Sequence, residues 1–516
     1  MDERISAALQ VLPNYLGQHV LLSASALALG LAIALPLVVL ASRSARVRWP
    51  VLAFASVIQT VPSLALLALF YPILLGLASL AERVFGHGFS ALGFLPSLLA
   101  LTLYSILPIV RNGTTALLNL DPAVIEAARG VGMTERQKLL RVELPLAAPV
   151  LMAGVRTSAV WVIGTATLST PVGQTSLGNY IFAGLQVENW VSVLFGCIVA
   201  VLLALATDQI LALIEIGVAK RRPRVAFAGV ALLAAGIAAA LVPMARDGKP
   251  EYVVGAKNFT EQYILSALMA DRIRAQGAAV ARRTGLGSVV AYRALANNEL
   301  DAYVDYSGTL WANVLNRTDN PPRAELLKEM TVQLRDRDGV TVLGTLGFEN
   351  AYALAMRRDR AESLGIRTIA DLAAHAPNLR IGGDFEFFDR PEWRALKATY
   401  GLEFREQRQF QSTFMYRAVA VSDVDVISAF SSDGRIATYD LVLLEDPRQA
   451  ILPYDAVVLL SPGRATDETL RRALEPLIGA IRVELMRAAN QRVDREEGKE
   501  SPAQAARWLA RAAGLE

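Results

Sequence analysis

The chain has 516 residues and a formal net charge of +3, with 53% hydrophobic and 19% charged residues. Its length allows several domains, and the small net charge does not indicate a nucleic-acid-binding protein. The single cysteine, Cys197, has no partner for an internal disulfide, and the three histidines show no metal-ligand spacing. We therefore expect no metal site, no cofactor and no nucleic-acid partner.

The apolar residues are concentrated in the first half of the chain, whereas the second half has an ordinary soluble composition. Runs of about 20 apolar residues can cross a bilayer as helices. The second such run contains Pro62 and Pro72, so we expect it to be kinked or broken. The predicted spans lie at about 20–41, 51–80, 93–118, 147–170, 188–215 and 225–243.

Basic residues indicate how these spans are oriented. Three arginines at 43–48 follow the first span, segment 126–145 follows the third, and a basic stretch at 220–224 follows the fifth. By the positive-inside rule these three loops are cytoplasmic. We therefore expect an external N-terminal segment at 1–18 and external residues after the sixth span.

Four charged residues fall within or near the predicted spans. Arg156 and Asp208 lie deep enough for us to expect that they pair inside the helix bundle. Arg111 and Glu215 are expected near the cytoplasmic boundary, where long side chains reach the aqueous phase.

Segment 126–145 reads EAARGVGMTERQKLLRVELP and has a characteristic spacing. Glu-Ala-Ala opens the segment at 126–128, and Gly132 comes six residues after the glutamate. Val142 comes ten residues after Gly132, and Leu-Pro closes the segment at 144–145. The segment resembles the EAA loop of ABC-importer permeases, which in that family is a cytoplasmic helix-turn-helix seated in a groove of the ATPase subunit. The resemblance implies that the ATPase docks on Glu126, Ala127, Ala128, Gly132, Leu144 and Pro145.

The resemblance implies an all-α transmembrane permease domain at 19–218, with the run at 225–243 as an additional tether. The chain lacks the Gly-x-x-x-x-Gly-Lys-Ser/Thr phosphate loop. ATP would therefore be hydrolysed by a separate ATPase subunit, and we expect this chain not to be an enzyme. The other expected partners of this chain are membrane lipid and a second copy of itself or a homologous permease.

Residues 250–516 alternate between short strands and helices, which predicts α/β architecture with mainly parallel sheets. The length suits two lobes with a cleft between them. Asn258 or Thr260 is expected to cap a helix at about 260–276, and the run from about 466 is expected to form amphipathic helices that pack on a lobe. Ligands in such folds bind at the carboxyl ends of strands.

The segments after these strands are GAKNFTEQ, DYSGT, GFENAYALAM, FEFFDR, ISAFSSDGR and ILPYDAV. Together they resemble the soluble binding proteins of glycine betaine, carnitine and choline importers. That resemblance implies an aromatic box for a trimethylammonium group, formed by Tyr306, Tyr352, Phe430 and Tyr454. It also implies ligand contacts from Lys257, its neighbour Asn258, Thr309 and Arg390, with Arg394 or Arg405 as alternatives to Arg390.

The chemistry of such a ligand explains these residue types. A quaternary ammonium has no N–H donor, but aromatic faces attract it at roughly 0.5–2 kcal/mol per contact. A ligand carboxylate needs cationic donors, which Lys257 and Arg390 supply. Phe430 stands where a tyrosine is common in the family, so it keeps the aromatic face and removes a hydroxyl.

The expected function is that of an ABC-importer subunit in the inner membrane, with its binding domain outside, that imports a quaternary-ammonium zwitterion. An importer of ergothioneine, a betaine of thiolated histidine, is an alternative of the same architecture. A membrane-anchored solute sensor is an alternative of another class, but segment 126–145 argues against it because a sensor does not need an ATPase dock.

Overall fold

The structure is a computed structural model of the chain that describes residues 3–85, 89, 91, 93–186, 189–246, 251–495 and 497–515. Its internal contacts divide the chain into two compact units. The helical unit comprises Met1–Phe182 and Trp190–Gly248, and the α/β unit comprises Ala183–Asn189 and Lys249–Glu516. The boundaries predicted for the domains and the tether remain predictions.

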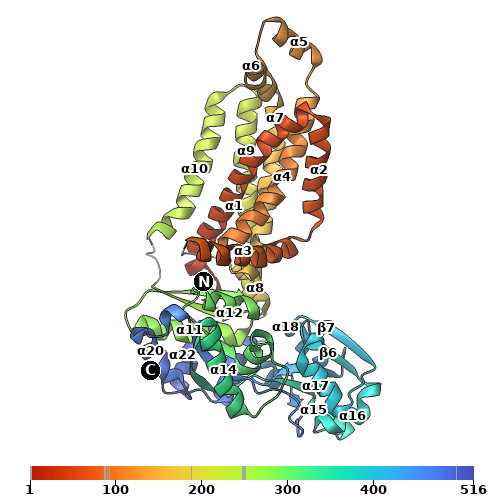
Figure 1. Cartoon of the computed structure of the whole chain (residues 1–516), viewed down its shortest axis with the longest axis vertical. Helices are drawn as coiled ribbons and strands as arrows, with labels where there is room; N and C mark the ends of the chain where they lie inside the picture. The colour runs from red at the N-terminus through yellow and green to blue at the C-terminus, as the bar shows by residue number, and fades with distance from the viewer. Residues whose placement is uncertain are drawn as a thin grey trace. The chain divides into compact units, whose positions relative to one another are not determined.

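The helical unit is a bundle in which α1 packs on α4 and α7, and α9 packs on α7 and α10 (Figure 1). The helices of residues 3–246 are α1 (Glu3–Arg43), α2 (Ala45–Thr60), α3 (Ser63–Phe85), α4 (Phe94–Leu118), α5 (Pro122–Gly130), α6 (Glu135–Lys138), α7 (Leu144–Ala166), α8 (Gly178–Gln186), α9 (Trp190–Ala219) and α10 (Pro223–Arg246).

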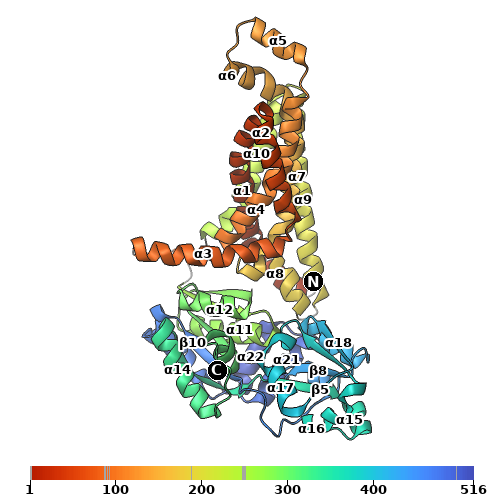
Figure 2. The ribbon, with the colours of Figure 1, turned by 45° about the vertical axis from the view of Figure 1, so that its right-hand side comes forward.

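Within the described residues, six apolar helices are long enough to cross a membrane. The run predicted at 51–80 is broken at Pro62, because α2 ends at Thr60 and α3 begins at Ser63. Only α3 of these two is a candidate span, and it runs crosswise to the bundle (Figure 2). The candidate spans are Ala8–Arg43, Ser63–Phe85, Phe94–Leu118, Glu135–Val172, Trp190–Ala219 and Pro223–Pro243.

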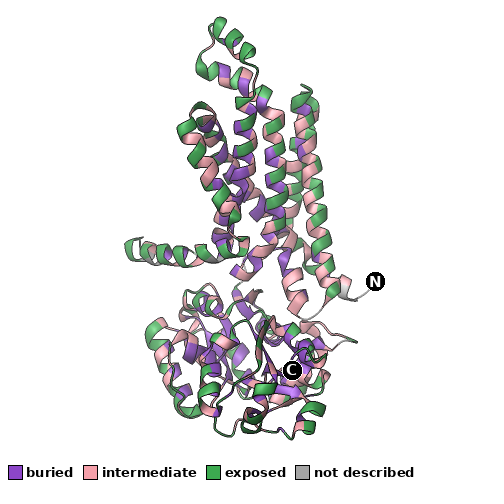
Figure 3. Ribbon diagram, turned by 90° about the vertical axis from the view of Figure 1, so that its right-hand side faces the viewer, coloured by how far each residue is buried: buried purple, intermediate pink, exposed green. Residues whose placement is uncertain are grey.

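The helical unit exposes many large apolar side chains, and its buried residues lie where its helices pack together (Figure 3). A Cβ on Gly154 in α7 would come within 2.7 Å of the Pro108 carbonyl oxygen in α4, so glycine permits this close helix approach. On α9, by contrast, Leu194, Ile198 and Leu205 are 55–60% exposed. An apolar surface of this kind suits lipid rather than water.

The predicted pairing of Arg156 with Asp208 is confirmed. The guanidinium of Arg156 on α7 donates to both carboxylate oxygens of Asp208 on α9, at 2.9 and 2.8 Å. It also donates to Glu215, further along α9, at 2.8 Å. Glu215 is therefore a third member of this network, which the sequence did not predict.

Segment 126–145 contains two short helices and a turn, as the resemblance implied. Helix α5 ends at Gly130, and Gly132 has a φ of +79°, a conformation that favours glycine. Thr134 and Gln137 then form a capping box that starts α6. A π-helical turn at Leu139–Glu143 leads into α7, with Pro145 in its first turn.

The α/β unit has two five-stranded sheets, which confirms the predicted two-lobed α/β fold. The chain crosses to the second sheet between β4 and β5 and returns before β10. The first sheet has the order β2 (Val280–Leu286), β1 (Tyr252–Lys257), β3 (Ala302–Tyr306), β10 (Asp455–Leu460) and β4 (Thr341–Glu349). The second has the order β7 (Glu406–Phe410), β6 (Arg380–Asp384), β8 (Val426–Phe430), β5 (Tyr352–Arg357) and β9 (Leu441–Leu443).

In each sheet four of the five strands point the same way, which confirms the expectation of mainly parallel sheets, and one strand, β10 or β5, runs against the others. Strands β1, β2 and β3 are parallel, as are β6, β7 and β8, but β10 is antiparallel to β3 and β4, and β5 is antiparallel to β8 and β9. The cause is the exchange between lobes: β5 and β10 each enter a sheet directly from the other lobe, without the helical crossover that a parallel connection needs.

Helices cover both sheets, and the C-terminal run packs on a lobe as predicted, because α20, α21 and α22 all contact α11. Helix α11 begins after Phe259, with no side-chain cap, so the predicted cap by Asn258 or Thr260 is wrong. These helices are α11 (Thr260–Ala275), α12 (Ser288–Ala296), α14 (Arg323–Asp338), α15 (Arg358–Leu364), α16 (Ile369–His375), α17 (Pro391–Tyr400), α18 (Ser412–Ala420), α19 (Arg435–Thr438), α20 (Glu468–Leu474), α21 (Val483–Asp494) and α22 (Pro502–Ala512).

Candidate ligand-binding site

Three of the four predicted box residues lie together. Tyr352 begins β5 and pairs in register with Phe430, the last residue of β8. The two ring centroids are 4.9 Å apart. Tyr454, which directly precedes β10, presents its ring edge-on to Tyr352 with the centroids 6.0 Å apart. We call these three rings, with Phe387, the Tyr352 cluster.

Phe387 is a member that the sequence reasoning missed. Its ring lies 5.4 Å from that of Tyr352, and its side chain is fully buried. It lies in the short 3-10 helix Phe387–Asp389 after β6. The signal was present in the aromatic run of FEFFDR, but alternation along the chain does not show which phenylalanine a 3-10 turn directs inward.

Tyr306, the fourth predicted box residue, makes other contacts. Its ring lies 6.0 Å from that of Phe259. Its hydroxyl donates to Glu261 at 2.6 Å and accepts from the amide of Gln262 at 3.0 Å. Burial raises the pKa of Tyr306 well above its usual value, so its phenol is neutral.

The DYSGT segment touches the Tyr352 cluster through Tyr454. The Ser307 hydroxyl donates to the Pro453 carbonyl at 2.9 Å. A Cβ on Gly308 would lie 2.6 Å from the Tyr454 ring, so the ring packs against the bare glycine backbone. Thr309 is buried one residue further along.

Lys257 is the last residue of β1 and is 2% exposed. Its ammonium forms an ion pair with Asp305, which is fully buried. It also lies 5.2 Å from the centre of the Tyr306 ring. The charge that the resemblance assigns to a ligand carboxylate is thus paired with a protein carboxylate in this structure.

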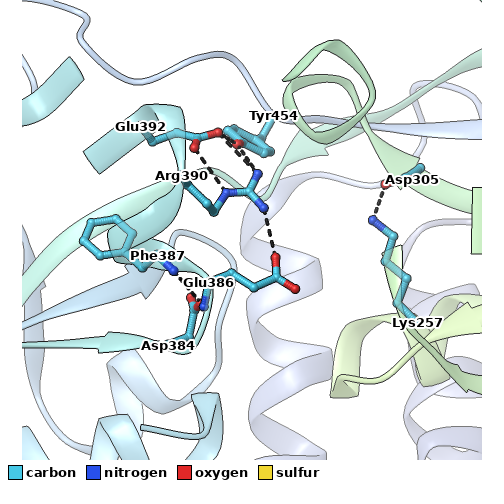
Figure 4. A network of polar contacts seen from close by, with 8 residues as sticks. All are labelled: Lys257, Asp305, Asp384, Glu386, Phe387, Arg390, Glu392 and Tyr454. Atoms are coloured by element: carbon cyan, nitrogen blue, oxygen red, sulfur yellow. Dashed lines mark hydrogen bonds and ion pairs between the residues drawn. The ribbon is translucent and has the colours of Figure 1, made fainter. Parts of the chain in front are cut away.

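Arg390 lies against the Tyr352 cluster (Figure 4). Its guanidinium donates to Glu392 at 3.1 Å, to Glu386 at 3.2 Å and to the Tyr454 hydroxyl at 3.0 Å. It stacks 5.0 Å from the centre of the Tyr352 ring. Burial opposes its charge, but Tyr454, Tyr352 and Glu392 outweigh burial and raise the pKa of Arg390. The alternatives Arg394 and Arg405 are exposed.

Glu392 and Asp384 are two carboxylates of the site that the sequence reasoning missed. Glu392 accepts from both Arg390 and the Tyr454 hydroxyl. Asp384 ends β6, is 5% exposed, and accepts from the backbone N–H groups of Glu386 and Phe387 at 2.8 and 3.0 Å. Burial raises the pKa of Asp384, and hydrogen bonding to the Glu386 N–H only partly opposes the shift.

A polar hollow adjoins this group. It is lined by residues of both lobes that include Asn258, Glu261, Asn350, Phe430, Ser432, Asp433, Arg435, Asn490 and Asp494. Asn258 and Phe430 are the predicted site residues on its wall. Burial raises the pKa of Glu261 to about 7, while hydrogen bonds from Ser432, Tyr306 and Asn490 oppose the shift.

Two family profiles match this chain. Residues 26–220 match the inner membrane component of binding-protein-dependent transport systems, and residues 250–511 match the substrate-binding domain of ABC-type glycine betaine transport systems. Within the described residues, no three His, Cys, Asp or Glu side chains gather to hold a metal ion.

Named relatives cover one or both parts. The ergothioneine transport permease/ergothioneine binding protein of Helicobacter pylori is 28% identical over 85% of this chain and 79% of its own length. The choline transport system permease of Bacillus subtilis is 37% identical over 38% of this chain and 84% of its own length. The glycine-betaine-binding protein of Pseudomonas aeruginosa is 31% identical over 47% and 82%.

The fold, the site and these matches define a transport protein of the inner membrane, in which a permease and a substrate-binding domain share one chain. It is not an enzyme. The chain belongs to the family of ABC importers that includes the glycine betaine, carnitine and choline transport systems.

Proposed function

We propose that this chain captures a quaternary-ammonium compound outside the cell and passes it through its own membrane domain. A cytoplasmic ATPase subunit docked on segment 126–145 supplies the energy, and a second copy or a homologous permease completes the path. The observation that carries the choice of ligand is the convergence of Tyr352, Phe430 and Tyr454 from three strand ends. Aromatic ring faces attract a cation that cannot donate a hydrogen bond.

Within this proposal, Tyr306, Lys257, Asn258 and Thr309 line the same cleft from the first lobe, and Arg390 from the second. Lys257 is paired with Asp305, and Arg390 with Glu392. To bind a ligand carboxylate, each cation either divides its hydrogen bonds between the ligand and its protein partner or breaks the ion pair. Exchange of this kind fits a binding protein whose lobes open and close, since each cation needs a partner when no ligand is bound.

Ergothioneine is a second candidate ligand. A relative that aligns over 85% of this chain is named for ergothioneine transport and binding. Ergothioneine also carries a trimethylammonium group, so the aromatic faces suit it equally. Its thiolated imidazole adds bulk and N–H donors that the simple betaines lack.

Titration calorimetry on the full chain in lipid nanodiscs tests the proposal. Glycine betaine, choline, carnitine and ergothioneine are compared with tetramethylammonium and with the non-methylated amino acid glycine. Binding of at least one trimethylammonium compound, with no binding of glycine, supports the proposal. A folded chain that binds none of them contradicts it.

A further inference from the structure

Asp384 is a buried carboxylate beside the Tyr352 cluster, and one of its two oxygens has no hydrogen-bond donor within the described part of the chain. One oxygen, Oδ1, accepts from two backbone N–H groups, whereas Oδ2 makes no hydrogen bond of normal geometry to the described residues. One of these N–H groups belongs to Phe387, a member of the Tyr352 cluster, so this carboxyl lies beside the cluster (Figure 4). A buried acceptor left without a donor destabilises the fold, so a donor placed there by a ligand stabilises the bound state.

The charges around the cluster do not supply that partner. Lys257 pairs with Asp305, and Arg390 pairs with Glu392 and Glu386. In the part of the chain that the structure describes, no cationic side chain forms an ion pair with Asp384. Asp384 is therefore buried beside the aromatic rings without a direct ion pair to a described residue, and Arg390 attracts it only from a distance.

A trimethylammonium group compensates this charge but cannot satisfy the acceptor, because it has no N–H. A second group on the ligand has to do so. Glycine betaine has no O–H or N–H donor at all, whereas choline and carnitine each have a hydroxyl and ergothioneine has imidazole N–H groups. The spare acceptor therefore separates ligands that the aromatic rings alone would treat alike.

We propose that Asp384 is a specificity-determining residue that accepts a hydrogen bond from an O–H or N–H group of the ligand, so that the site takes donor-bearing quaternary-ammonium compounds in preference to donor-free ones. The inference rests on the proposed function and narrows its ligand class. A hydrogen bond to a charged acceptor predicts a preference of roughly 10- to 100-fold.

Matched ligand pairs test this on the full chain in nanodiscs. Choline is compared with n-propyltrimethylammonium, which has the same charge and nearly the same shape but a methyl in place of the hydroxyl. Carnitine is compared with γ-butyrobetaine, its analogue without the hydroxyl. The wild-type chain should bind the hydroxyl-bearing member of a pair roughly 10-fold or more tightly.

The variant Asp384→Asn retains Oδ1 as an acceptor for the two backbone N–H groups and removes the charge. It should abolish the preference within each pair, mainly by weakening choline. Asp389→Asn is the matched control, because Asp389 lies on the same loop, carries the same charge and is exposed. It should keep the wild-type preference.

The possible failures are distinct. If the wild-type chain binds both members of each pair equally, the acceptor role of Asp384 is overturned while the proposed function stands. That role is also overturned if Asp384→Asn lowers the affinities for choline and for n-propyltrimethylammonium by the same factor, since Asp384 then acts only as a counter-charge. If the wild-type chain binds no trimethylammonium compound, the proposed function itself fails. The ligand-pair comparison needs no variant, so a misfolded Asp384→Asn does not prevent the decision.

Discussion

Tyr352 is the ring on which the site is centred, since Phe387, Phe430 and Tyr454 all lie within 6.0 Å of it. The ring faces rather than the hydroxyl should hold a trimethylammonium group. We expect Tyr352→Phe to cost under about 1 kcal/mol of binding free energy and Tyr352→Ala roughly 2 kcal/mol or more. Titration calorimetry gives both values. Intact affinity in Tyr352→Ala would place the box elsewhere.

The same comparison at Tyr306 and Tyr454 has an additional consequence. The Tyr306 hydroxyl donates a hydrogen bond to Glu261 and accepts one from Gln262. The Tyr454 hydroxyl accepts a hydrogen bond from Arg390 and donates one to Glu392. Removing either hydroxyl leaves buried polar groups without a partner, which lowers the stability of the fold. At these two positions we therefore expect Tyr→Phe to cost under about 1 kcal/mol of affinity but to lower the melting temperature visibly.

Lys257 is tested by the difference between two ligands. If its ammonium binds the ligand carboxylate, Lys257→Ala should weaken glycine betaine or carnitine and leave choline, which has no carboxylate, nearly unchanged. Choline is the internal control, because it reports the damage from leaving Asp305 buried without its ion pair. Equal losses for choline and carnitine would make Lys257 a structural residue.

Glu261 should make stability depend on pH. Burial raises its pKa from 4.5 to about 7 in the folded protein. The folded state therefore binds this proton more tightly, so the stabilisation is fully present below about pH 4.5 and is lost as the pH rises through about 7. Chemical unfolding between about pH 5 and 8 should show wild-type protein losing stability relative to Glu261→Gln as the pH rises.

Asp494 is the neighbouring group that complicates this measurement. Burial raises its pKa to about 6, so it titrates over the same range with the same sign. Asp494 is present in both wild type and Glu261→Gln. Subtracting the unfolding free energies of the two proteins at each pH therefore removes most of the contribution of Asp494. A difference that does not change with pH would mean that Glu261 is already ionised in the fold.

Site residues that belong to short sequence motifs could be predicted, whereas residues whose roles depend on tertiary contacts could not. Tyr352 and Tyr454 were predicted through short motifs at strand ends, and they lie together. Glu392, Asp384 and Phe387 were missed because their roles arise from a 3-10 turn and a buried ion pair that no periodicity records. The ion pair of Lys257 with Asp305 joins two neighbouring strands, and only the sheet order reveals it.

At the scale of elements, the helices and strands were predictable where the pattern was periodic. Strands β1, β3, β6 and β8 end at the segments GAKNFTEQ, DYSGT, FEFFDR and ISAFSSDGR, where strand ends were predicted. The direction of β5 and β10 was not predictable, because it depends on which lobe the chain arrives from. Pro62 marked the break between α2 and α3 because proline lacks the N–H that a continuous helix needs.

The turn between α5 and α6 is the element on which coupling to an ATPase can be tested. Gly132 has a φ of +79°, and no atom lies within 4 Å of the position of an added Cβ. Gly132→Asp therefore strains the backbone and adds a charge without an internal clash. We expect lost uptake with unchanged ligand affinity, measured by transport into cells and by calorimetry on the purified chain.

Gly401→Asp is the matched control for that change. Gly401 ends α17 in the α/β unit, with a φ of +67° and open space around an added Cβ. The backbone strain is therefore comparable, whereas the position is far from segment 126–145 in the sequence. We expect this variant to retain uptake. Normal uptake by Gly132→Asp would mean that segment 126–145 is not the dock.

At the scale of the whole molecule, the two units have separate cores. The helical unit exposes apolar faces that suit lipid, whereas the α/β unit buries its apolar residues around two sheets of its own. This separation allows binding and translocation to be measured independently. Tethering also keeps the binding domain near its permease at an effective concentration of roughly millimolar.

The last prediction concerns residues 250–516 expressed alone. Both five-stranded sheets and the C-terminal helices that pack on α11 lie within this segment, so each sheet keeps its strands and its covering helices. We expect it to be a folded monomer that binds the same trimethylammonium compounds as the full chain, with affinities within about 1 kcal/mol, a factor of roughly five. Sedimentation and calorimetry measure the two properties. A folded monomer that binds nothing, beside a full chain that binds, would mean that the membrane domain completes the site.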